Sequence, residues 1–101
     1  MKGAMRADLP GHDLIEQGLD DLAAGVETAA ALLVSIGAPR LGQLGVSVAS
    51  PIPSSEHRLY ALLSRTDPDS AHSRYNALIR RLVSFERALA RANRESSDPP
   101  R

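Results

Sequence analysis

Apolar residues recur in alternating steps of four and three along two long stretches of this chain, and this spacing constrains the fold more than any other feature. The first stretch runs from Ile15 to Ile36 and the second from Tyr75 to Ala92. A seven-residue repeat keeps one narrow stripe of a helix facing a partner. Both stretches are therefore predicted to be helices that pack through this stripe.

Local signals give the ends of the helices. We expect a first helix over residues 13–36, because Gly37 and Pro39 favour a stop there. Asp67 followed by Pro68 is a strong start signal for a last helix over residues 68–93. A short helix over residues 56–65 is expected between them. Residues 40–53 are an ordered, partly apolar connection, and no sheet is expected because a second strand is missing.

The predicted fold class is all-α, with two long antiparallel helices plus a short helix. The apolar stripes of two copies are expected to meet in a four-helix-bundle-like homodimer, since a chain of 101 residues alone buries a limited core. The domain is expected over residues 11–94, after a flexible leader over 1–10 and before a disordered tail over 95–101. The expected interface residues are Gly18, Leu22, Gly25, Val26, Leu33, Tyr75, Leu78, Leu82, Phe85 and Leu89.

Gly18 and Gly25 are seven residues apart, on one side of the predicted first helix. A glycine inside a helix lowers stability by about 0.5–1 kcal/mol relative to alanine, unless a neighbouring group packs into the space that a side chain would fill. We interpret the pair as a groove that admits a partner helix closely. The alternative is that both glycines are merely tolerated.

The formal net charge is zero, which argues against a general affinity for nucleic acid or membranes. The two halves differ, however: residues 1–53 contain three basic and six acidic side chains, and residues 54–101 contain nine basic and six acidic ones. The chain has no cysteine, and its start lacks the apolar core of a secretory signal. Arginine and alanine dominate in the manner of a GC-rich bacterial genome, so a bacterial cytoplasmic protein is expected.

Arginines crowd the predicted last helix, where Glu86 is the single acidic residue between positions 73 and 94. These arginines form either a solvated outer face or a surface that binds an anion. The anion could be an acidic protein, a phosphate backbone, or the row Asp13, Asp20 and Glu27 of a partner copy. The candidate binding residues are Arg74, Arg80, Arg81, Arg87, Arg91 and Arg94.

Arg65 and His72 have six residues between them, and this spacing resembles the arginine-to-histidine pair of HEPN-type RNases, a family of small helical and often dimeric toxins. The resemblance implies an active site at these two residues. Arg6 and His12 have a similar spacing, but no other catalytic, metal or cofactor pattern stands out, and the three histidines are far apart. The preferred interpretation is a non-enzymatic interaction or regulatory protein. The alternatives are a HEPN-like toxin RNase and a nucleic-acid-binding accessory protein, for which stacking aromatics and a helix-turn-helix are missing.

Overall fold

The computed structural model describes the backbone of residues 8–97 and the side chains of residues 8–95. The element order is α1 (His12–Ala23), α2 (Ala29–Ile36), α3 (Ala38–Gln43), α4 (Ser55–Thr66), the 3₁₀ turn η1 (Pro68–Ser70) and α5 (Ala71–Ser97). Residues 8–97 contain no β-strand, which confirms the all-α class over this part of the chain. Residues 1–7 of the predicted leader and 98–101 of the predicted tail lie outside the described residues.

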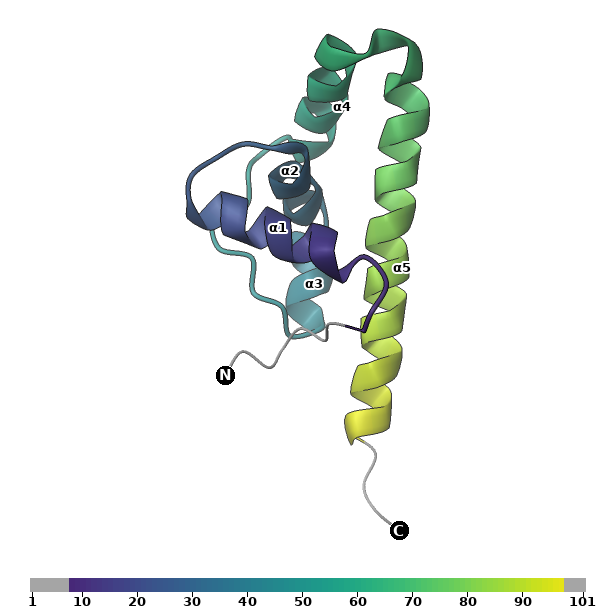
Figure 1. The fold of residues 1–101 in the computed structure, drawn as a ribbon. Helices are drawn as coiled ribbons and strands as arrows, with labels where there is room; N and C mark the ends of the chain where they lie inside the picture. The colour runs from purple at the N-terminus through teal and green to yellow at the C-terminus, as the bar shows by residue number, and fades with distance from the viewer. Residues whose placement is uncertain (1–7, 98–101) are drawn as a thin grey trace.

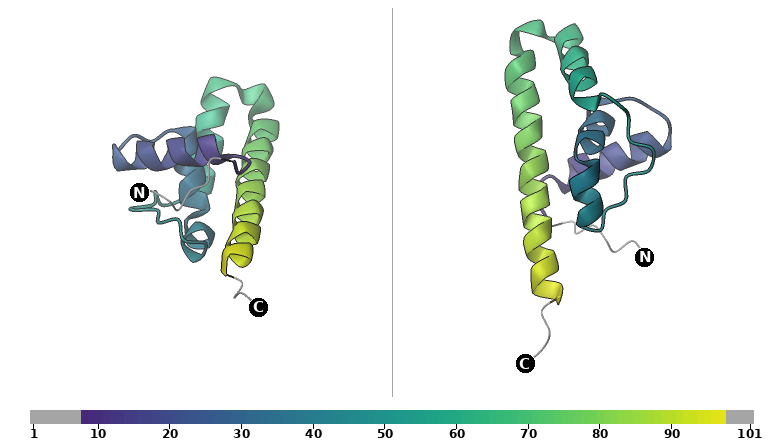
Figure 2. Two further views of the ribbon diagram at one scale, coloured as in Figure 1. Left: turned by 60° about the horizontal axis from the view of Figure 1, so that its bottom comes forward. Right: turned by 180° about the vertical axis from the view of Figure 1, so that it is seen from behind.

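The long helix α5 forms one side of the molecule, α4 and α2 pack against it, and α1 runs crosswise over α2 with its start toward α5 (Figure 1). At 27 residues α5 is about 40 Å long, because an α-helix rises about 1.5 Å per residue. α4 returns alongside its first half, and the two views of Figure 2 show both helices joined at one end by η1. The predicted short helix and last helix are thus confirmed.

The predicted continuous helix over residues 13–36 is wrong, because the chain turns between Ala23 and Ala29. Gly25 adopts a left-handed conformation with φ of 75°. Its N–H donates to the carbonyl of Leu22 at 3.0 Å, and the N–H of Val26 donates to that of Asp21 at 2.8 Å. These two bonds are the Schellman arrangement that ends a helix at a left-handed glycine.

A new helix starts directly after this turn. Thr28 is extended, and its hydroxyl accepts a bond of 3.1 Å from the N–H of Ala31, which caps α2. The same hydroxyl donates to Asp21 at 2.6 Å and so ties the start of α2 to α1. The fold therefore has one long helix and several short ones, instead of the two long antiparallel helices that the sequence predicts.

Gly18 lets α1 approach α2 closely. A Cβ at this position would lie 2.3 Å from the carbonyl oxygen of Ala30 and 2.8 Å from a methyl carbon of Val34. A groove at Gly18 is thus present, but the helix that occupies it is α2 of the same chain. Gly25 instead lies in the turn after α1, where a Cβ would meet nothing within 4 Å.

The core lies where α2 meets α1, α4 and α5. Its largest fully buried side chains include Ile15, Leu32, Leu59 and Phe85. Burying such a side chain contributes about 1.5–3 kcal/mol relative to leaving it in water. The half-buried Leu9 also packs on this cluster and draws the segment before α1 against the domain.

The connection over residues 44–54 is held by side-chain hydrogen bonds. The hydroxyl of the buried Ser35 accepts from the N–H of Ile52 at 3.0 Å and donates to the carbonyl of Ala31 at 2.8 Å. The amide of Asn93 donates to the carbonyl of Leu44 at 2.9 Å. Pro39 does not prevent a helix here, because it lies in the first turn of α3, where a missing N–H costs nothing.

Candidate functional site

All six arginines predicted for binding are exposed along α5. Four of them follow one another at intervals of seven, four and three residues, which places them on one side of a helix with 3.6 residues per turn. This row of Arg80, Arg87, Arg91 and Arg94 is the arginine face. Arg74 and Arg81 form a second row, seven residues apart, and Arg81 lies next to Gly11 at the start of α1.

The burial of the opposite side of α5 explains why the arginines point outward. Leu82, Phe85 and Leu89 are between 0% and 3% exposed, and they fill the side that meets α2 and α4. A charged side chain on that side would lose its hydration without a partner. The polar residues therefore occupy the remaining surface of the helix.

The arginine face is unpaired within the described side chains, in which none of its four guanidinium groups has an ion pair or hydrogen bond. Elsewhere, arginines do find partners. Arg58 binds Glu27 through two bonds of 2.6 and 2.8 Å, and Arg40 donates to Gln43 at 3.3 Å. Four positive charges without an ion pair among the described side chains thus lie along about 21 Å of α5, which is the rise of an α-helix over fourteen residues.

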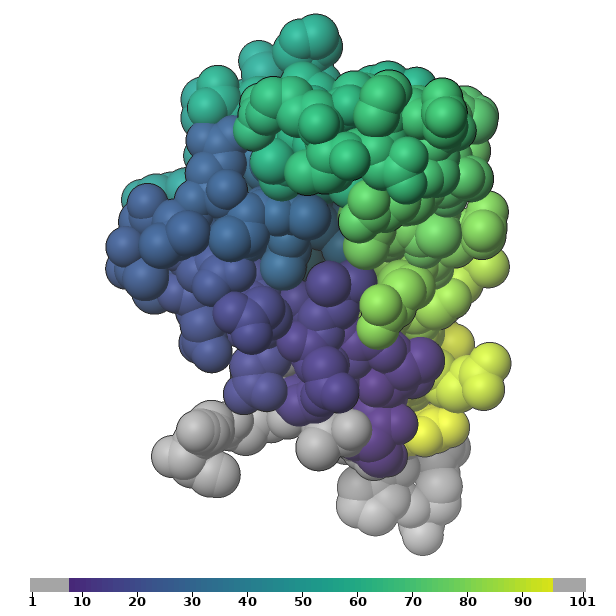
Figure 3. All heavy atoms as spheres, turned by 45° about the horizontal axis from the view of Figure 1, so that its top comes forward, coloured from purple at the N-terminus to yellow at the C-terminus, as the bar shows by residue number. Residues whose placement is uncertain are grey.

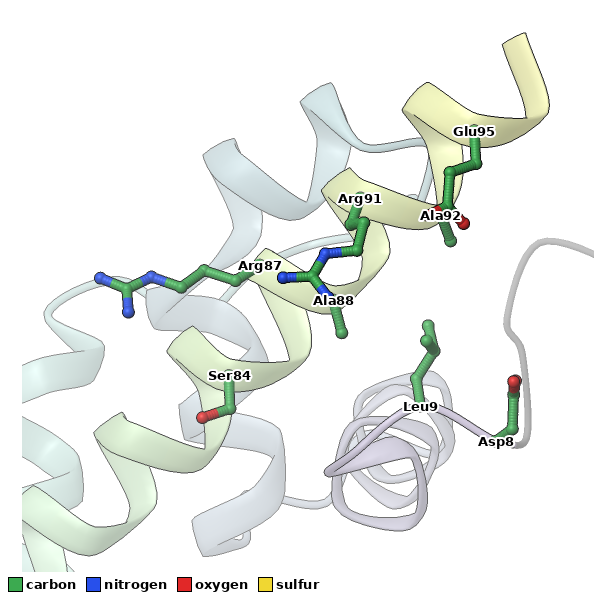
Figure 4. Close-up of a pocket in the computed structure, with 8 residues that line it drawn as sticks. All are labelled: Asp8, Leu9, Ser84, Arg87, Ala88, Arg91, Ala92 and Glu95. Carbon is green, nitrogen blue, oxygen red and sulfur yellow. The ribbon is translucent and has the colours of Figure 1, made fainter. Parts of the chain in front are cut away.

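Two shallow hollows flank this face where the segment before α1 approaches α5. One, of about 420 Å³, lies between Leu9 and the stretch of α5 from Ser84 to Glu95 (Figure 4). The other, of about 470 Å³, lies between Pro10, Gly11 and the stretch from Ala77 to Ser84. Because both share Ser84, they form one trough.

Small residues make the floor of the trough. Ala77, Ser84, Ala88 and Ala92 line it from α5, and arginines stand at its edges. Figure 4 shows Leu9 pointing from the facing segment toward α5, with Arg87 and Arg91 extending from the helix. A surface of this kind lets another helix come close while its charges pair with the guanidinium groups.

The predicted dimer interface is largely used within one chain. Leu33, Leu82, Phe85 and Leu89 are buried by the chain's own helices, and Gly18 is buried against α2. Leu22, Tyr75 and Leu78 are half-buried. Val26 is 48% exposed beside Gly25 in the turn. A second copy therefore has to bind a surface other than the continuous seam.

The predicted acidic row is shortened by the turn after α1. Asp13 and Asp20 are exposed on α1, whereas Glu27 lies beyond the helix and pairs with Arg58. The hydrogen bond from Arg58 lowers the pKa of Glu27. Asp13 and Asp20 have no side-chain partner among residues 8–95.

Arg65 and His72 lie on opposite sides of η1, at the end of α4 and the start of α5. Both are exposed, and a ring nitrogen of His72 lies 3.2 Å from the amide of Asn76. RNA cleavage that is lost in His72→Ala would establish the RNase interpretation. In the described part of the chain, no three side chains of metal-ligating type gather to hold an ion.

The sequence did not reveal a third hollow, of about 410 Å³, between the α2–α3 corner and α5. Its lining includes Ile79, Tyr75 and Glu86. Burial raises the pKa of Glu86, although the charge of Arg40 opposes this effect. Burial also raises the pKa of Tyr75, whose ring lies 5.8 Å from that of Tyr60. Only the packing of α2 and α3 against α5 could disclose this site.

Comparison with protein families, curated proteins and solved structures finds no significant match to this chain. Within residues 8–97, no helix combines the length and apolar character that crossing a membrane requires.

Proposed function

We propose that this chain is a small helical interaction protein that binds an acidic segment of a partner through the arginine face of α5. The observation that carries the proposal is the row Arg80, Arg87, Arg91 and Arg94, which is exposed and has no ion pair or hydrogen bond among the described side chains. Asp8 and Glu95 line the same hollow as Arg87 and Arg91, so the row is unpaired but not remote from acids. Arginine binds carboxylates in a planar, two-bond geometry, so such a row is suited to an acidic helix or strand.

The trough beside this row supports a protein partner over a nucleic acid. The trough combines alanines, Leu9 and Pro10 with charged side chains that include Asp8 and Glu95. A phosphate backbone gains nothing from the apolar residues and is repelled by the carboxylates. Single-stranded nucleic acid also requires exposed aromatic rings for stacking. Phe85 is buried, and Tyr60 and Tyr75 lie near each other by the third hollow, not in the trough.

A binding experiment with defined peptides tests this proposal. The probe is a fluorescent helical peptide with glutamates at positions i, i+4 and i+7, compared with the same peptide carrying lysines and with an RNA hairpin. The acidic peptide is expected to bind, with an affinity that falls as salt is added. Tighter binding of the RNA hairpin than of the acidic peptide would contradict the proposal.

A matched pair of variants locates the binding surface. Arg87→Ala removes a guanidinium group at the centre of the arginine face, and Arg65→Ala removes an equally exposed one from α4. The first is expected to weaken peptide binding by up to about fivefold, as loss of an exposed ion pair of at most roughly 1 kcal/mol predicts. The second should leave the affinity unchanged. Equal effects of both variants would show that net charge, and not this face, attracts the peptide.

A further inference from the structure

We infer that the arginine face of one copy of this chain is covered by α1 of a second copy. The acidic segment is then part of the protein itself, and the molecule forms a dimer through charge and not through the apolar seam. The inference depends on the proposed function, because it assigns a partner to the same arginines.

The charges of the two helices match in sign and in spacing. Asp13 and Asp20 are exposed on α1, seven residues apart, and Arg80 and Arg87 are exposed on α5 at the same interval. Seven residues of helix span about 10.5 Å in both cases. Two carboxylates without a partner in the described structure can thus face two guanidinium groups that also have none there.

The side chains around each row permit the two helices to come close. The outer side of α1 also carries the exposed Glu16, Gln17 and Ala23, with no large apolar residue among them. The floor of the trough beside the arginine face consists of Ala77, Ser84 and Ala88. Apart from its charged side chains, the α5 lining of the trough is short, and Leu9 faces it from the segment before α1.

The position of the two helices allows a closed dimer. α1 begins against α5, since a Cβ on Gly11 would lie 3.2 Å from the carbonyl oxygen of Arg81. Figure 3 shows the start of α1 next to α5, and the rest of α1 running away from α5 over the same face of the molecule. A twofold axis between the two helices places each α1 opposite the α5 of the other copy. The contact then occurs twice and closes, as in most symmetric dimers.

Charge also sets the strength that we expect. The chain has a formal net charge of zero, so two copies do not repel each other as a whole. Single exposed ion pairs contribute about 0.2–1 kcal/mol, so the dimer should be reversible and weak. Screening lengths shrink from about 30 Å at 0.01 M salt to about 3 Å at 1 M. High salt should therefore dissociate it.

Charge reversal tests the pairing directly. The acid-reversed variant Asp13→Arg/Asp20→Arg and the base-reversed variant Arg80→Asp/Arg87→Asp change only exposed side chains, and circular dichroism checks that each is folded. Four exposed ion pairs give at most about 4 kcal/mol, which is a Kd of about 1 mM. Sedimentation equilibrium at low salt and near this chain concentration should show a wild-type dimer and two monomeric variants. An equal mixture of the variants should again form a dimer, because each α1 then meets an α5 of opposite charge.

The outcomes separate this inference from the proposed function. A wild type that is monomeric at low salt, or a mixture that stays monomeric, overturns the pairing of α1 with α5. Dimerisation of either reversed variant alone at wild-type strength also overturns it. If the acidic peptide still binds and Arg87→Ala still weakens it, the proposed function stands without the dimer. If the peptide fails to bind at concentrations that dissociate the dimer, the proposed function fails as well.

Discussion

Gly18→Ala tests the contact on which the first half of the fold depends. The added Cβ would lie 2.3 Å from the carbonyl oxygen of Ala30, which is about 1 Å short of ordinary van der Waals contact. The carbonyl of Ala30 is part of the helix backbone and cannot rotate away as a side chain can. In the variant, α1 and α2 therefore have to move apart. Overpacking of this kind costs about 1–3 kcal/mol, and a backbone clash belongs at the upper end.

A gain in helix propensity offsets part of this cost. Alanine is better than glycine inside a helix by up to about 1 kcal/mol. The free energy of unfolding should therefore fall by about 2 kcal/mol, which for a domain of this size lowers Tm by about 8–16 °C. Urea unfolding followed by circular dichroism measures the first quantity, and a thermal scan measures the second.

Gly42→Ala is the matched control. Gly42 also lies in a helix, but a Cβ there would meet nothing within 4 Å. The control should be as stable as the wild type or more stable by up to about 1 kcal/mol. If Gly18→Ala is as stable as Gly42→Ala, then α1 and α2 do not touch at Gly18, and the reasoning about their packing is refuted.

Three further changes probe the core, the turn and the third hollow. Phe85→Ala should lower the free energy of unfolding by about 3–5 kcal/mol in urea titrations, because the ring is fully buried, and a loss below about 1 kcal/mol would contradict that position. Gly25→Ala should lower the free energy of unfolding by about 1–2 kcal/mol, because φ is 75° and alanine disfavours this left-handed conformation. Gly25→Asn should lower it less, because asparagine tolerates the conformation better. Equal stability of the wild type and both variants would argue against a left-handed turn. Burial raises the pKa of Glu86, so its protonated form is favoured by folding and the associated stability is lost as the pH rises through the raised pKa. Glu86→Gln should therefore be more stable than the wild type near pH 7, and this difference should disappear below the unfolded pKa of about 4.3. Urea midpoints of both proteins across this pH range measure the difference, and a difference that does not change with pH would contradict the prediction.

The second half of the fold could be predicted from local signals, because those signals are strong and consistent. The pair Asp67 and Pro68 marks the turn before α5, and apolar spacing continues without interruption from Tyr75 to Ala92. The helix predicted over residues 56–65 is found as α4 (Ser55–Thr66). Here capping, propensity and periodicity all favour the same structure.

The first half could not be predicted from its spacing, since a seven-residue stripe is compatible with one long helix and with two short ones. In both arrangements an apolar side chain is hidden every three or four residues. The signals of the turn, Gly25 and then Thr28, are present in the sequence. These signals can be recognised as a turn only once α1 is seen to fold back on α2. The carbonyl of Ala30 then occupies the space that a side chain on Gly18 would need.

The candidate site was also predictable only in part, because some of it depends on contacts between segments far apart in the sequence. Exposure of the arginines follows from the buried stripe on the opposite side of α5, so it could be expected from periodicity. The trough depends on Leu9 and Gly11 lying against residues about 70 positions later in the chain, and no local pattern encodes such a contact. The partial burial of Glu86 arises from an equally distant contact with the α2–α3 corner.

The way in which α5 is covered constrains how this protein can bind. Its apolar stripe is already occupied by the chain's own helices, so a partner cannot gain the free energy of covering it. What remains for binding along the outer side is charge, arranged beside a floor of small residues. Charge across an interface determines association rate and specificity more than strength. An interface built on the arginine face should therefore form fast, dissociate readily and respond to salt, which suits reversible contacts and not a permanent assembly.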